Sequence, residues 1–232
     1  AGGTIAASQI ARAAPDGYSI LVGFTGPIVF APHIYPNLPY DPLKAFTPVV
    51  HLCSQPFVFA VTANLGVSTL EEFVKLVKSK PGEINYASVG NGSVPHVAME
   101  QFKSNVGIDM LHVPYNGAAA ATNVASGVSH AMLGTLMLVK PLVDAGRLVI
   151  LAQTGGVRME SLPNVPTIAE SLVPRFEAAG LVGLFAPRGT PEDVVSKLNL
   201  EVNAMLSSAD GRRRITATHA IPGGGTPESF QR

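Results

Sequence analysis

Hydrophobic and polar positions follow two different periods along this chain. Apolar residues recur at helical spacing in five segments, which are residues 5–14, 68–80, 94–103, 118–126 and 191–206. Between them lie short apolar runs that lack this spacing, at residues 18–24, 51–63, 84–88, 109–117, 130–137, 147–153 and 176–189. Because strands and helices alternate almost throughout, the pattern predicts an α/β fold with mainly parallel sheets.

Two of these segments give sharper expectations. The helix after Val67 is predicted to start with Ser68 as its N-cap, and Glu71 stands at the capping-box position. The aliphatic run that follows Gly146 is predicted to be a parallel strand buried on both faces. The proline-rich residues 30–50 exclude a long helix there, because proline lacks the N–H that a helix interior needs.

Residues 84–103 read as a strand, a glycine loop and a helix. The alternation of residues 84–88 breaks at Gly90, Asn91, Gly92 and Ser93, and the helical spacing begins after them. Ser93 suits an N-cap. Such a loop presents backbone N–H groups and a partial positive charge, which suit a carboxylate or a phosphate. An ordinary turn between a strand and a helix remains the alternative.

Several catalytic and cofactor motifs are missing from this loop. Pro95 stands where a dinucleotide fingerprint needs its third glycine, and the sequence around Ser93 is not the elbow of a hydrolase. The six histidines show neither the H-x-x-x-H spacing of a metal site nor a paired carboxylate. We therefore expect no catalytic residue, no metal and no cofactor, although a triad of distant residues stays open.

Composition narrows the class of protein further. Sixteen basic residues balance sixteen acidic ones, and no basic stripe is present, which argues against nucleic-acid binding. No apolar run has the length of a membrane span. Cys53 is the only cysteine, so an internal disulfide is impossible. The opening AGGTIAASQ contains no signal peptide, and we expect both ends of the chain to be incomplete.

Two apolar strands bracket a middle block of about 120 residues, a plausible domain size. If the strands 55–61 and 179–187 both cross between domains, residues 58–179 form one lobe, and residues 1–57 with 180–232 form the other. A ligand cleft would then lie between the lobes. Thr25 and Gly26 follow the strand 18–24, where open α/β sheets place their ligands, so both are site candidates.

The chain resembles the substrate-binding proteins of the tripartite tricarboxylate transporters, also called the Bordetella uptake gene family. The stretches that carry the resemblance run in family order over nearly the whole chain: AGGTIAASQIARAAPDGYSILVG, IYPNLPYDPLKAFTPVV, NYASVGNGSVPH, HVPYNGAAAATNVASGV, LPNVPTIAES and LFAPRGTPEDVVSKLN. Each motif is weak alone, and together they are specific.

This resemblance implies a type II periplasmic binding fold, with two α/β lobes joined by two crossing strands around a ligand cleft. It implies a periplasmic, monomeric solute-binding protein that is not an enzyme. Such a protein would capture a small di-/tricarboxylate or aromatic acid and deliver it to the subunits of a membrane transporter. A ligand sensor of the same fold, acting through a signalling partner, is the alternative.

The resemblance also implies the ligand contacts, largely through backbone N–H groups, small hydroxyls and water. By position they are Thr25, Gly26, Ser88, Gly90, Asn91, Gly92 and Ser93. Tyr115 is a further candidate, which either lines the cleft or caps the core. His130 is another, because it stands near where many members carry an aspartate. The missing aspartate makes an amino-acid ligand less favourable.

Overall fold

The computed structural model describes residues 3–231, which form two compact units. One unit combines residues 1–55 and 180–232, and the other contains residues 56–179. The chain passes from one unit to the other inside the long strand β2 (Phe46–Thr62) and again at the start of β7 (Ala179–Pro187). These two strands are the only segments in which the chain changes unit among the described residues.

The first unit contains both ends of the chain. Its sheet has the order β1-β7-β2, with β8 paired to β2, and the β1–β7 and β2–β8 pairs are antiparallel. Its other elements are α1 (Thr4–Ile10), β1 (Leu21–Phe24), the π-helix η1 (Gly26–Phe30), α2 (Ala31–Ile34), α3 (Pro42–Ala45), α9 (Glu192–Ser207), α10 (Ala209–Thr216), β8 (Ile221–Pro222) and α11 (Pro227–Gln231).

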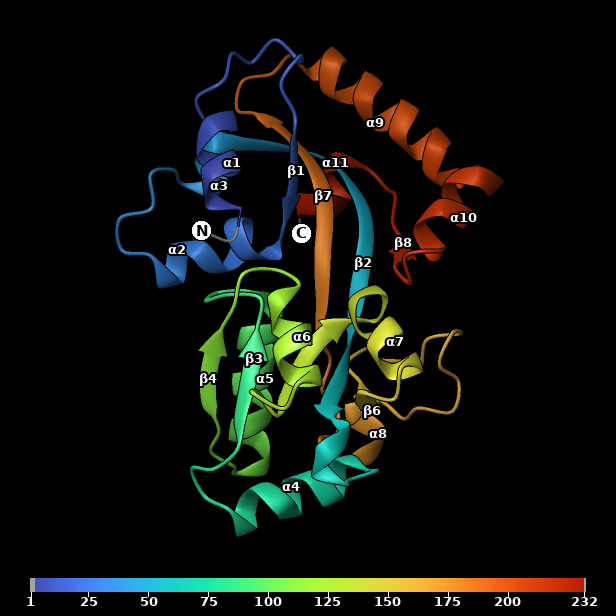
Figure 1. Cartoon of the computed structure of the whole chain (residues 1–232). Helices are drawn as coiled ribbons and strands as arrows, with labels where there is room; N and C mark the ends of the chain where they lie inside the picture. The colour runs from blue at the N-terminus through green and yellow to red at the C-terminus, as the bar shows by residue number, and fades with distance from the viewer. Residues whose placement is uncertain (1–2, 232) are drawn as a thin grey trace. The chain divides into compact units, whose positions relative to one another are not determined.

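The second unit has five strands in the order β6-β2-β5-β3-β4. Figure 1 shows β3 and β4 side by side, with α5 and α6 on opposite sides of the sheet. Its remaining elements are η2 (Ala63–Leu65), α4 (Leu70–Ser79), β3 (Asn85–Ser88), α5 (Val94–Val106), β4 (Leu111–Pro114), α6 (Ala119–Ala125), β5 (Ala131–Thr135), α7 (Leu136–Asp144), β6 (Leu148–Gln153) and α8 (Ile168–Ser171).

The period of two in the strands divides the core of the second unit into two layers. Phe57, Phe59 and Val61 of β2 pack with α4 and α5, whereas Val58 and Ala60 face α6 and α7. The same alternation runs across the sheet, because neighbouring strands keep their side chains in register. A sheet covered on both faces by helices is the α/β class, which confirms the sequence prediction.

The predicted strand direction was wrong for much of the protein. In the second unit β3 pairs in parallel with β4 and β5, whereas β2 runs antiparallel to β5 and to β6. Thus β6 is not the parallel partner that its aliphatic sequence suggested. An unbroken aliphatic run indicates burial on both faces of a sheet, which is typical of parallel strands, but an antiparallel strand covered on both faces has the same pattern.

The proline-rich residues 30–50 contain short helices and the start of a long strand. Helices α2 and α3 have four residues each, so the exclusion of a long helix is confirmed. Strand β2 already begins at Phe46, five residues before the apolar run that predicted it. Pro48 and Pro56 are accommodated within this strand, which shows how tertiary pairing overrides a local breaker.

The N-cap of α4 is Thr69 and not Ser68. The Thr69 hydroxyl accepts the Glu72 N–H at 3.2 Å, and the Glu72 carboxylate accepts the N–H groups of Thr69 and Ser68. Thr69–Glu72 and Ser68–Glu71 have the same spacing in the sequence. The apolar face with Leu70 and Phe73 is the same for either cap, and in the structure α4 starts at Leu70, which places the Thr69 hydroxyl at the Glu72 N–H.

We therefore predict that Thr69→Ala lowers the free energy of unfolding by about 1 kcal/mol, since the Glu72 N–H loses its acceptor. Ser68→Ala should change it by less than about 0.5 kcal/mol, because the Ser68 side chain takes no part in the cap. Urea unfolding of the two variants checks this expectation. Equal losses would contradict the assignment of the cap.

Candidate functional site

The glycine loop lies between β3 and α5 in the second unit. Strand β3 ends at Ser88, and α5 begins at Val94. Ser93 is the N-cap, as predicted, and its hydroxyl accepts the His96 N–H at 3.4 Å. Since β4 and β5 run parallel to β3, the loops that follow all three strands start from the same edge of the sheet.

Two serine hydroxyls fix the backbone of this loop at Gly90. Ser93 Oγ donates to the Gly90 carbonyl at 2.7 Å, and Ser88 Oγ accepts the Gly90 N–H at 3.1 Å. Gly90 has φ of 129°, a conformation that residues with a side chain rarely adopt. The side chain of Asn91 is exposed at the tip of the loop, whereas Gly92 and Ser88 are buried.

Two histidines support the loop from below. His112 Nε2 lies 2.7 Å from Ser88 Oγ, and His96 Nδ1 accepts the Gly92 N–H at 3.3 Å. The two imidazole rings stack with centroids 4.1 Å apart. His112 also stacks on Tyr86 at 4.9 Å, because residues 86 and 112 are direct partners in the parallel β3–β4 pair.

Charges next to this stack are paired. The Tyr86 hydroxyl donates to Glu100 at 2.5 Å, and Lys103 Nζ lies 2.9 Å from the same carboxylate and 5.4 Å from the Tyr86 ring centroid. Burial raises the pKa of Glu100, but the hydrogen bonds from Tyr86 and Lys103 outweigh it, and the net pKa is lowered. Glu100 therefore remains ionised at neutral pH with its charge compensated.

Both stacked histidines are neutral at pH 7. Burial, followed by the neighbouring His96, lowers the pKa of His112 to about 4. Burial also lowers the pKa of His96, and this effect outweighs the attraction of Glu100 for a proton. The neutral state agrees with the geometry, because an acceptor at His96 Nδ1 requires an unprotonated nitrogen.

The structure brings only part of the predicted site together. Gly90, Asn91, Gly92 and Ser93 form the loop itself, whereas the buried hydroxyl of Ser88 acts on the loop from beneath. Its role is support of the loop backbone.

Tyr115 lies beside the loop through its backbone but not through its ring. Its N–H donates to the Ser88 carbonyl at 2.9 Å. The ring packs into the core layer under α6 and α7, and its hydroxyl lies 3.2 Å from Ser129 Oγ. Of the two roles that the sequence left open, the structure shows the core contact.

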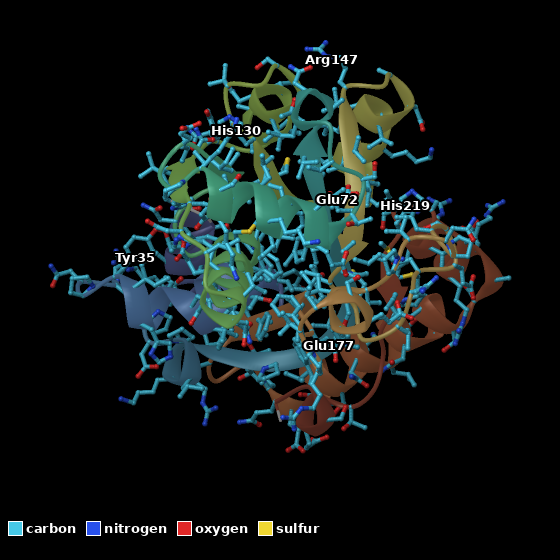
Figure 2. The ribbon with its side chains drawn as sticks, turned by 90° about the horizontal axis from the view of Figure 1, so that it is seen from below. Tyr35, Glu72, His130, Arg147, Glu177 and His219 are labelled. Carbon is cyan, nitrogen blue, oxygen red and sulfur yellow. The ribbon has the colours of Figure 1, made fainter. Side chains whose placement is uncertain are left out.

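His130 lies at the opposite end of β3 from the glycine loop. It directly precedes β5, and its Nδ1 accepts the N–H of Asn85 at the start of β3, at 3.2 Å. The loop follows the other end of β3, about 10 Å further along the strand. Figure 2 labels His130 among the side chains of this unit. The structure thus gives His130 a contact between strands and does not join it to the loop.

Thr25 and Gly26 belong to the first unit. The Thr25 hydroxyl accepts the Leu181 N–H of β7 at 2.8 Å, and Gly26 is the first residue of η1. This hydrogen bond fixes the end of β1 against the crossing strand. The role of both residues as ligand contacts stays a prediction.

The two supporting histidines, His96 and His112, were not predicted from the sequence. His96 was visible three residues after the N-cap, where a side chain can reach back to the loop. His112 was hidden because it meets Ser88 only through the pairing of β3 with β4. Within residues 3–231, no group of three or more histidine, cysteine or acidic side chains is placed to hold a metal. No helix in that range is long and apolar enough to span a bilayer.

The two-unit α/β structure, with its glycine loop at a helix N-terminus, is the fold of periplasmic binding proteins. The chain belongs to the family described as tripartite tricarboxylate transporter family receptor (TctC), whose model matches residues 1–216. The sequence resemblance is therefore confirmed, and the family includes the Bordetella uptake gene proteins.

Three solved structures are closely similar. The R. palustris protein Rpa4515, solved with adipate, has 36% identity and a TM-score of 0.94, and the match covers 99% of this chain and 77% of that one. The periplasmic binding protein BugD has 30% identity and a TM-score of 0.88, with 100% and 78% covered. MatC from Rhodopseudomonas palustris, with bound malate, has 34% identity and a TM-score of 0.85, with 96% and 76% covered.

The buried stack predicts a pH dependence of stability. An unfolded His112 takes up a proton near its ordinary pKa of 6.5, whereas the folded ring resists protonation until about pH 4. The contribution of the neutral ring is therefore fully present above about pH 6.5 and is lost as the pH falls toward 4. Urea midpoints measured over this range should fall less steeply for His112→Gln than for the wild type. Identical slopes would contradict the assignment.

Proposed function

We propose that this protein is a periplasmic solute-binding protein that captures a small organic acid with two or three carboxylates and passes it to a tripartite tricarboxylate-type transporter. The carrying observation is the glycine loop at the N-terminus of a 13-residue helix, whose backbone is fixed by the side chains of Ser88 and His96. Membership of the receptor family and the adipate and malate bound to two similar proteins support the same class of ligand.

The chemistry of the loop favours an anion without demanding a charged partner. No lysine or arginine occurs between Ile84 and Gln101, so this segment offers no such side chain for an ion pair with a bound acid. Lys103, which follows this segment on α5, is 12% exposed and paired with Glu100. Recognition then depends on N–H groups and on the helix dipole, which together favour a carboxylate at the first turn of α5.

Binding alone accounts for this arrangement. The Ser93 hydroxyl donates its proton to the Gly90 carbonyl and not to a base, while Nδ1 of the neighbouring His96 accepts the Gly92 N–H. The neutral His112 contacts the buried Ser88, which no substrate can reach. We therefore propose a role in capture and delivery and no turnover.

A thermal unfolding panel tests the proposal. Adipate, malate and a tricarboxylate are compared with adipamide, which has the length of adipate but no charge. An acid at a hundred times its dissociation constant should stabilise the protein by about 2.7 kcal/mol, which raises the midpoint by several degrees. Adipamide should leave the midpoint unchanged. A shift with adipamide equal to that with adipate would contradict carboxylate recognition.

A variant with an added negative charge tests whether the acid binds at the loop. Asn91→Asp keeps the size of the exposed side chain at the loop tip and adds a negative charge. At about 4 Å from a bound carboxylate in water, this repulsion is worth about 1 kcal/mol, so the dissociation constant should rise about fivefold. Calorimetric titration measures it, with Asn105→Asp near the other end of α5 as the control. Equal affinities for both variants would remove the loop from the site.

A further inference from the structure

His96 occupies an unusual position for a histidine in a binding site. It is the third residue of α5 and lies two turns before Lys103, yet its ring turns back to the loop and accepts the Gly92 N–H through Nδ1. The bond joins a side chain to the backbone of the loop itself. Gly92 is buried and has φ of 73°, so its N–H direction is set by a left-handed turn.

The stack prevents the ring of His96 from leaving this position. His112 covers one face of the His96 ring at a centroid distance of 4.1 Å with an angle of 20° between the rings. The other face of His112 rests on Tyr86, whose ring is fully buried. His112 in turn contacts Ser88, which fixes Gly90. One stack therefore supports the loop at both of its glycines.

We propose that His96 is a positioning residue for carboxylate binding: its neutral ring, clamped by His112, holds the Gly92 N–H and with it the anion-binding conformation of the loop. The inference rests on the proposed function, because it concerns the same loop. Protonation of His96 turns Nδ1 into a donor that faces the Gly92 N–H. Two donors cannot share a hydrogen bond, so the loop is released and the acid binds more weakly.

Charged and titratable groups surround the stack, and they oppose the weakening of acid binding by His96 protonation only in part. From α5 they are Glu100 and Lys103, from β3 Tyr86, and from the turn before β4 Asp109, which lies 3.9 Å from Lys103 Nζ. Glu100 favours a proton on His96, while Lys103 opposes it, and burial decides for the neutral ring. A protonated ring would attract a carboxylate, so the sign of the pH effect separates attraction from positioning.

Two substitutions at His96 separate the hydrogen bond from the ring. His96→Asn retains an acceptor close to the position of Nδ1 and cannot titrate, whereas His96→Phe retains a flat ring for the stack and has no acceptor. With adipate and malate as probes near pH 7.5, we expect His96→Asn to bind within about threefold of the wild type. His96→Phe should bind about tenfold more weakly, the worth of one hydrogen bond.

The pH profile supplies a readout that a purely structural role would not move. The ratio of the wild-type dissociation constant to that of His96→Asn cancels the titration of the acid itself. It should rise as the pH falls from about 7.5 to about 5, because only the wild-type ring becomes protonated. His219→Asn, which removes a histidine of the first unit, should follow the wild type. A ratio that is constant or falls with pH overturns the inference.

The wild-type protein provides a test that needs no variant. Nitrogen NMR of His96 at neutral pH should show an unprotonated Nδ1, and the Gly92 amide should exchange slowly with solvent. A protonated Nδ1 overturns the inference even if His96→Phe fails to fold. If the wild type binds neither acid, the proposed function fails as well. If the wild type binds and both variants bind equally, only the positioning role fails.

Discussion

The buried hydroxyl of Ser88 is the contact on which the site depends. The glycine loop leaves the β-ladder after the last residue of β3, so side chains must satisfy and hold its backbone. Ser88 does so from the last position of β3, where its hydroxyl meets both the N–H and the carbonyl of Gly90. The Ser88 hydroxyl is buried, and left without partners such a group would cost about 1–3 kcal/mol.

The position of Ser88 depends in turn on the side chains packed beneath it. Residues 86 and 88 point to the same face of β3, and that face is covered by α5 and flanked by β4. His112 fills the space between them, and the ring of His96 closes the stack from α5. Glu100 and Lys103 neutralise one another on the same helix, which keeps net charge away from the rings. The conformation of the loop thus depends on packing in the core.

The sequence predicted the parts of this site that are local. Gly90 and Gly92 predict a turn and Ser93 predicts a helix cap, and the structure has both at these positions. The α/β class followed from the two hydrophobic periods, which the packing of β2 residues on alternate faces reproduces. Each of these features is decided by neighbours in the chain, so one sequence was enough to find them.

The parts that the sequence could not supply depend on pairing at long range. Nothing near Ser88 indicates His112, because 24 residues separate them and only the β3–β4 register brings them together. The predicted direction of β6 was wrong for the same reason, since its partner β2 precedes it by almost a hundred residues. The cap is Thr69 and not Ser68, a choice that the sequence leaves open because both residues have a glutamate three positions later. Local signals fix the type of an element, and tertiary contacts fix its phase and partners.

The proposed recognition through backbone groups also explains why the sequence does not specify the acid. An N–H group has the same chemistry at every residue, so a loop such as Gly90–Ser93 identifies an anion but not its carbon skeleton. Selectivity must then come from how rigidly the N–H groups are held and from the side chains around them. A loop fixed by two serines and two histidines is preorganised, which reduces the entropy lost when the ligand binds. If the loop holds the acid as proposed, the affinity then also depends on His96 and His112, which fix the loop from the core side.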